Sequence, residues 1–136
     1  ASPLHISCKH NRVDIAKFLI GCGVDVNCQD EHGQTPLLLC CIHGNPQIAS
    51  NLIEASISGH LTEPLEVDIA DHRGLTPLNC AAIKGDHDMV RSLLSRGNAN
   101  PNQASPKGCT PLMYAGRGGY SDCVRLLLEK KASALK

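Results

Sequence analysis

The stretch LTPLNCAAIKGDHDMVRSLLSRGNANPNQASPKG (residues 75–108) decides the fold, because its opening tripeptide is repeated along the chain. Ser or Thr followed by Pro-Leu occurs four times, at residues 2–4, 35–37, 76–78 and 110–112. The spacings are 33, 41 and 34 residues in a chain of 136. A period near 33 residues is typical of proteins in which small helical units stack on one another. The chain is therefore expected to consist of four stacked units.

Each unit contains the signals that begin and end a short helix. Ser or Thr before Pro provides an N-cap and places proline at the first helical position, where its missing N–H leaves no bond unmade. Each helix is then expected to end at a residue that tolerates the left-handed conformation, namely Asn11, Gly44, Gly85 or Gly119. Between these signals lies a pair of small residues that lets neighbouring helices approach closely: Ser7-Cys8, Cys40-Cys41, Ala81-Ala82 and Ala115-Gly116.

A second helix is predicted in every unit from apolar residues at helical spacing. Three positions recur and are expected to be buried: Ile15, Ile48, Met89 and Cys123 at the first, Leu19, Leu52, Leu93 and Leu127 at the second, and Ile20, Ile53, Leu94 and Leu128 at the third. Phe18 lies on the same helix as Ile15 and is also expected to pack. Stretches rich in Gly, Asn and Asp end the units and predict turns.

Taken together, these features resemble the ankyrin-repeat family across essentially all 136 residues. The resemblance implies an all-α solenoid of helix-turn-helix units joined by hairpin loops. We expect a single ankyrin-repeat domain over residues 1–136, cut from a longer protein, with repeats at about 1–33, 34–74, 75–108 and 109–136. The histidine that the family carries after the tripeptide is retained only at His5.

The second unit carries an eight-residue insertion within residues 54–66. We expect these residues to lengthen the second helix and then to form a loop that folds back through Ile57, Leu61 and Leu65. Such a loop either carries binding specificity or is a tolerated surface feature.

The composition of the chain limits which kinds of partner it is expected to bind and indicates its cellular compartment. Thirteen basic residues balance thirteen acidic ones, so no overall field favours nucleic acid. The longest apolar run, residues 37–42, is too short to insert into a membrane. The eight cysteines lie mostly at core positions, which indicates free thiols in a reducing compartment. We therefore expect an intracellular monomer, cytoplasmic or nuclear, that binds neither nucleic acid nor membrane.

The resemblance also implies where a partner binds, because ankyrin stacks use their concave groove and hairpin tips. The side chains expected there are Leu39, Ile42, His43, Arg73, Leu75, Cys80, Ile83, Lys84, Lys107, Tyr114 and Arg117. An apolar floor with a basic rim suits a protein or short peptide with apolar anchors and some acidic residues. Tyr114 is the favoured anchor, since aromatic residues are scarce in the chain and enriched at interfaces.

No catalytic, cofactor or metal site is predicted. His5, Cys8 and His10 are residue types that bind zinc, but zinc requires ligand pairs that converge on one point. No cysteine has the histidine and orienting partner that nucleophilic catalysis needs. The chain is therefore expected to be a non-catalytic interaction module. The alternative is a substrate-recruiting or intramolecular packing domain of a larger enzyme, such as a ubiquitin ligase or kinase.

One asparagine offers a possible modification site. Leu19 followed by Asp25-Val26-Asn27 resembles the pattern at which hairpin asparagines of ankyrin repeats are hydroxylated. Asn27 is therefore either a hydroxylation site or a residue that organises its turn through side-chain hydrogen bonds.

Overall fold

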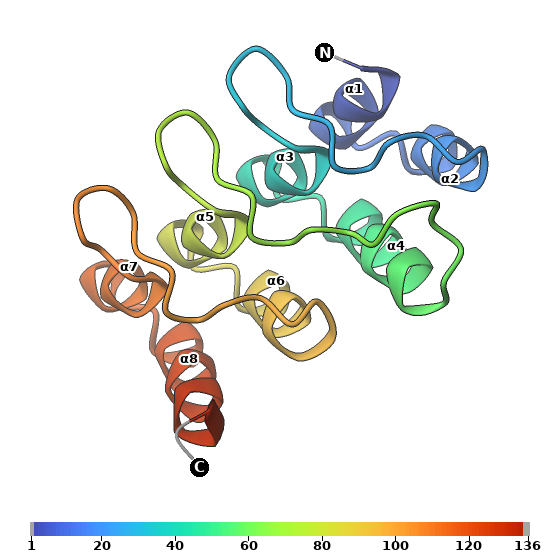
Figure 1. Ribbon diagram of the computed structural model, residues 1–136. Coiled ribbons are helices and arrows are strands. Elements are labelled where there is room, and N and C mark those ends of the chain that lie inside the picture. The colour runs from blue at the N-terminus through green and yellow to red at the C-terminus, as the bar shows by residue number, and fades with distance from the viewer. Residues whose placement is uncertain (1, 135–136) are drawn as a thin grey trace.

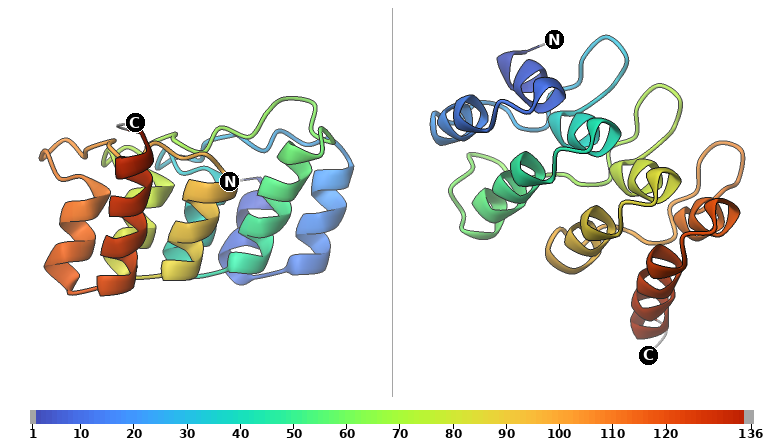
Figure 2. Two further views of the ribbon diagram at one scale, coloured as in Figure 1. Left: turned by 90° about the horizontal axis from the view of Figure 1, so that it is seen from below. Right: turned by 180° about the vertical axis from the view of Figure 1, so that it is seen from behind.

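The computed structural model describes residues 2–134, with side chains as far as residue 130. Within these residues the chain forms four helical pairs and no strand. The pairs are α1 (Pro3–His10) with α2 (Val13–Gly21), α3 (Pro36–His43) with α4 (Pro46–Ile57), α5 (Pro77–Lys84) with α6 (His87–Arg91) and its π-helical continuation η1 (Ser92–Arg96), and α7 (Pro111–Gly118) with α8 (Ser121–Ala134). The first helices form an inner row beside the hairpin loops, and the second helices form an outer row (Figure 1, Figure 2). This is the all-α solenoid that the repeat period predicts.

The four inner helices begin and end as the sequence predicts. In each, the hydroxyl of the capping Ser or Thr accepts a hydrogen bond from the N–H three residues later, at 3.2 to 3.4 Å. Each helix ends at a residue with positive φ, which is 56° at Asn11 and 70° to 74° at the glycines. These caps satisfy backbone groups that a short helix would otherwise leave unpaired, so four similar helices are set at regular intervals.

The core lies between the two rows, and the middle units bury their apolar positions as expected. Ile48, Leu52 and Leu93 are fully buried. The prediction was wrong for Ile15 and Leu128, which are 54% and 48% exposed, because they lie on sides of α2 and α8 that no other described helix covers. Phe18 is 70% exposed, so the expectation that it packs was also wrong.

The insertion lengthens the outer helix of the second pair and then folds back. α4 has 12 residues, whereas α2 has nine. Leu61 and Leu65 pack against the core, and the N–H of Leu65 donates to the hydroxyl of Ser56 at 3.1 Å. Ile57, in contrast, is 58% exposed and takes no part in this packing. The loop is therefore bound to the stack through two of the three expected residues.

The hairpins are held by carboxylates that accept backbone N–H groups. Asp30 Oδ1 accepts from His32 and Gln34, both at 2.9 Å. Burial alone would raise the pKa of Asp30, but the hydrogen bonds from Gln34 and His32 hold this pKa below its usual value. The N–H of His72 donates to the carbonyl of His32 at 3.0 Å, which joins neighbouring hairpins. The tips are therefore ordered before any partner binds.

Candidate functional site

The predicted binding surface combines the inner row with the hairpin tips, and nine of its eleven side chains are accessible at least in part. The exposed ones are His43, Arg73, Ile83, Lys84, Lys107 and Arg117. The half-buried ones are Ile42, Leu75 and Tyr114. The stack thus brings residues from three units onto one side of the molecule.

Leu39 and Cys80 are each only 5% exposed, so the expectation that they form an accessible groove floor was wrong. They occupy the same position in α3 and α5. Ile6 has this position in α1 and is 52% exposed, because no described helix covers it on that side. Burial raises the pKa of Cys80 to about 11, which keeps its thiol protonated. The accessible surface therefore lacks these two side chains.

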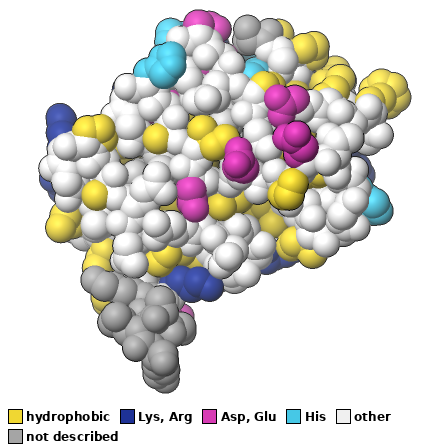
Figure 3. Space-filling view, in the orientation of Figure 1, with side chains coloured by type: hydrophobic (Ala, Val, Ile, Leu, Met, Phe, Trp, Pro, Cys, Tyr) yellow, Lys and Arg dark blue, Asp and Glu magenta, His cyan; other side chains and the backbone are white. Residues whose placement is uncertain are grey.

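A row of basic side chains marks the C-terminal ends of the inner helices. The last turns of α1, α3, α5 and α7 carry Lys9 with His10, His43, Lys84 and Arg117 respectively. Burial, followed by the nearby charges of Lys9 and Lys84, lowers the pKa of His43, which shows that these cations lie close together. Lys84 Nζ also donates to the carbonyl of Ile42 at 2.7 Å, where the negative end of the α3 dipole favours a cation. The opposite, loop-bearing face shows acidic side chains near its middle (Figure 3).

Tyr114 is held in place by contacts at both ends of its side chain. Its hydroxyl donates to Ser105 Oγ at 2.9 Å, and the Arg117 guanidinium lies 5.9 Å from its ring centroid. Arg117 Nη2 also contacts Cys109 Sγ at 3.8 Å. The aromatic ring and its cation therefore join α7 to the hairpin before it. A partner can reach only the part of the ring that this arrangement leaves open.

Arg73 is paired inside its own hairpin. Its Nε and Nη2 donate to Asp71 Oδ2 at 2.9 and 2.7 Å. The Asp71 side chain is 1% exposed, and its other oxygen accepts from the N–H groups of Arg73 and Leu75. A hydrogen bond to this carboxylate raises the pKa of Arg73. Arg73 therefore organises the tip and offers a partner less net charge than exposed Lys107 does.

His5 and Asn27, which the sequence analysis considered for metal binding and for hydroxylation, form hydrogen bonds within the fold. The ring of His5 contacts the Gln34 carbonyl at 2.8 Å and the Ser2 hydroxyl at 2.8 Å. Asn27 Nδ2 donates to the Pro64 carbonyl at 3.0 Å, and its Oδ1 accepts from the N–H of Glu66 at 2.9 Å. Asn27 therefore holds the end of the insertion, and its hydroxylation stays a prediction. Across residues 2–130, no group of three His, Cys, Asp or Glu side chains is placed to hold a metal ion.

The fold and this open, preformed surface define a helical-repeat protein of the class that recognises other proteins. A family model described as ankyrin repeats (3 copies) matches residues 1–62 and 55–135. The chain therefore belongs to the ankyrin-repeat family, whose repeats are protein-interaction modules and generally non-catalytic. In the part of the chain that the structure describes, no helix is both long and apolar enough to cross a membrane.

Curated relatives come from several kinds of protein. The B-cell lymphoma 3 protein homolog of Mus musculus is 29% identical over 93% of this chain and 28% of its own length. An ankyrin repeat protein of Variola virus is 34% identical over 85% of this chain and 19% of its own length. An E3 ubiquitin-protein ligase of Arabidopsis thaliana is 29% identical over 97% of this chain and 30% of its own length. The chain thus spans less than a third of each of these relatives.

Proposed function

We propose that this chain is a non-catalytic recognition module that binds a partner protein or short peptide across α3, α5, α7 and the adjoining hairpin tips. The observation that carries the proposal is the row of basic side chains beside Ile83, an apolar residue that is 41% exposed. The partner it suits has apolar anchors and some acidic residues. The chain binds it as a single copy.

Ile83 provides the most accessible apolar contact of this surface. Covering its exposed part would contribute on the order of 1 kcal/mol to binding. Ile42 has the same position in α3 and is half-buried, so it extends the apolar contact by one unit. Acidic groups of the partner would pair with Lys84 and Arg117. Such pairs at the rim of an interface give selectivity and fast association more than raw affinity.

The second candidate function is recruitment of a substrate, or packing within the same chain, as part of a larger enzyme. The observation that favours it is the similarity to an E3 ubiquitin-protein ligase, because the chain spans only 30% of that protein. In either case we propose four repeats with the boundaries predicted from the sequence. We also propose an intracellular location, cytoplasmic or nuclear, supported by five thiols buried in the core: Cys8, Cys40, Cys41, Cys80 and Cys123.

A peptide-library screen followed by binding measurements tests the first proposal. For a fluorescent peptide selected on the purified chain, Ile83→Ala should weaken binding about fivefold, which corresponds to about 1 kcal/mol. The matched control is Ile57→Ala, which removes the same atoms from an outer-row residue that is 58% exposed. If both variants keep their circular dichroism spectrum and bind the peptide equally well, the inner surface is not the binding site.

A further inference from the structure

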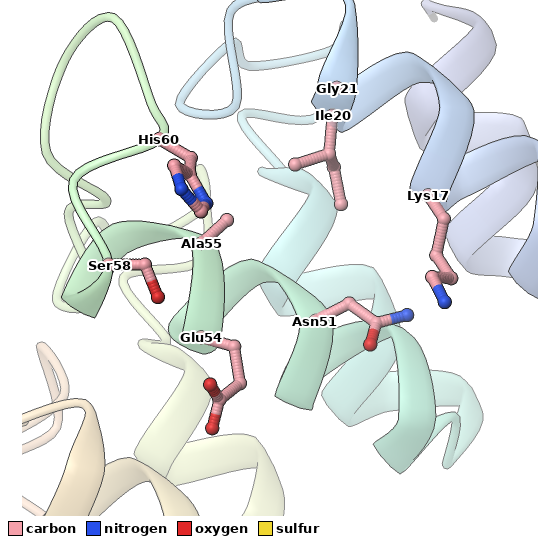
Figure 4. A pocket seen from close by; sticks show the side chains of 8 residues that line it. All are labelled: Lys17, Ile20, Gly21, Asn51, Glu54, Ala55, Ser58 and His60. Carbon is pink, nitrogen blue, oxygen red and sulfur yellow. The ribbon is translucent and has the colours of Figure 1, made fainter.

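An open groove lies between α2 and α4 on the outer row, away from the inner surface. Its volume is about 480 Å³. Figure 4 shows side chains from both helices and from the insertion around it. The residues that matter for its chemistry are Lys17, Ile20, Asn51, Ala55, Ser58 and His60. None of them belongs to the binding surface described above.

This groove is larger than its counterpart between η1 and α8. That counterpart is lined by residues at the same repeat positions and measures about 200 Å³. There Leu126 and Lys130 occupy the positions that Asn51 and Ala55 have in α4. At the open groove, α4 continues to Ile57 and the chain then turns, with the N–H of His60 donating to the Ala55 carbonyl at 3.0 Å. The smaller side chains of Asn51 and Ala55 thus leave a preformed space, which Ser58 and His60 also line.

The groove presents hydrogen-bond donors that have no partner in the described structure. Asn51 Oδ1 accepts from Gln47, but its Nδ2 is buried and lacks any hydrogen-bond acceptor among the described residues. Lys17 is exposed and makes no ion pair within residues 2–130. Figure 4 shows the Asn51 amide and the Lys17 ammonium directed into the same space. Because a buried N–H without an acceptor is unfavourable, an acceptor oxygen placed there would be bound well.

The acidic residue on the groove wall does not neutralise Lys17. Glu54 pairs with Arg96 of η1, on the side of α4 that faces the next unit. The local charge of the groove is therefore positive. Beneath it lie the apolar side chains of Ile20 and Ala55. The groove thus combines a cation and an amide donor with an apolar floor.

We propose that this groove binds a short acidic segment of a partner protein, with one carboxylate between Lys17 and Asn51 and a neighbouring apolar side chain over Ile20 and Ala55. The Ser58 hydroxyl is an additional donor at the mouth of the groove. The site lies on the outer row, so its occupation is independent of a ligand on the inner surface. The same chain would hold two partner segments on opposite sides.

The test uses the ¹⁵N-labelled chain and three synthetic peptides, acetyl-Gly-Leu-X-Leu-Gly-amide with X as Glu, Gln or Lys. The Glu peptide should shift the backbone amides of Lys17, Asn51 and Ser58, and it should bind at least tenfold more tightly than the Gln peptide. Lys17→Glu should abolish these shifts and transfer the preference to the Lys peptide. Lys107→Glu makes the same charge change on a hairpin tip and should leave the titration unchanged.

A second variant separates loss of the site from loss of the fold. Asn51→Leu places in the groove the residue type that Leu126 provides in the smaller counterpart, and it removes the unpaired amide. This variant should keep the dispersed spectrum of the folded chain and lose the peptide shifts. Equal binding of the Glu and Gln peptides, or shifts confined to the inner helices, would overturn the proposal.

Discussion

Gly85→Ala is a sharp test of how the third and fourth units dock. Gly85 ends α5 at φ 72°, where any side chain costs about 1–2 kcal/mol. A Cβ at this position would also lie 2.4 to 2.6 Å from three ring atoms of Tyr120, the residue that precedes α8. The ring is 37% exposed, so it must swing outward and lose its packing, which adds roughly 1–2 kcal/mol. The expected loss of stability is therefore about 2–4 kcal/mol.

Gly44→Ala is the matched control, because Gly44 has φ 70° and the nearest atom to its Cβ would be Lys84 Nζ at 3.5 Å. This variant should lose only the conformational part, about 1–2 kcal/mol. Urea unfolding followed by circular dichroism measures both. Tyr114 and Tyr120 are the two tyrosines of the chain and no tryptophan is present, so tyrosine fluorescence reports on the last unit alone. If the two variants lose the same stability, the contact between Gly85 and the Tyr120 ring does not contribute, and the reasoning is refuted.

Two further predictions concern a titrating side chain and a hydrogen bond. Because the pKa of His43 is lowered in the folded chain, the unfolded chain binds more protons, and stability should fall as the pH drops below about 6.5. His43→Gln should flatten this loss between about pH 7 and pH 5 in urea titrations, and an unchanged slope would contradict it. Asn27→Ala removes the acceptor of the Glu66 N–H and should speed its hydrogen exchange about fivefold, as expected for a bond of about 1 kcal/mol. Asp68→Ala, at the equivalent position of the next unit, should instead speed exchange of the Asn100 N–H, which donates to Asp68. If either variant speeds exchange at both Glu66 and Asn100, the effect is a general loosening and the prediction is contradicted.

The features that were predictable from the sequence depend on contacts between residues near one another in the chain. A Thr-Pro pair caps its own helix within three residues, as at Thr76, and Gly85 ends the same helix nine residues after Thr76. The helical period of Leu52 and Ile48 likewise needs no knowledge of the neighbouring unit. The period of the tripeptide then sets how often these local structures recur, and this is enough to define the solenoid.

The features that were not predictable depend on which neighbour covers a given side chain. Ile6 and Leu39 have the same position in their repeats, yet Ile6 is exposed and Leu39 is buried, because α3 has a preceding unit packed beside it and no described unit precedes α1. The outer groove is formed by Lys17 and His60, which are far apart in the sequence and meet only because the insertion turns back after α4. The sequence did contain a signal for this groove: Ala55 and Asn51 are smaller than Lys130 and Leu126, which the last unit has at the same positions.

The balanced composition of the chain conceals a separation of charge along the helices. Thirteen cations and thirteen anions cancel in number, but the loops at one end carry Asp25, Glu63 and Glu66, while the other ends of the inner helices carry Lys84 and Arg117. Fields of this kind act on a partner over about one Debye length, roughly 8 Å at physiological salt. In the proposed binding mode, an acidic segment would be attracted to the C-terminal ends of the inner helices and repelled by these acidic loop residues. The charge pattern would then favour the helix ends as the place where the proposed segment binds, whereas Ile83 and Tyr114 would contribute to how tightly it is held.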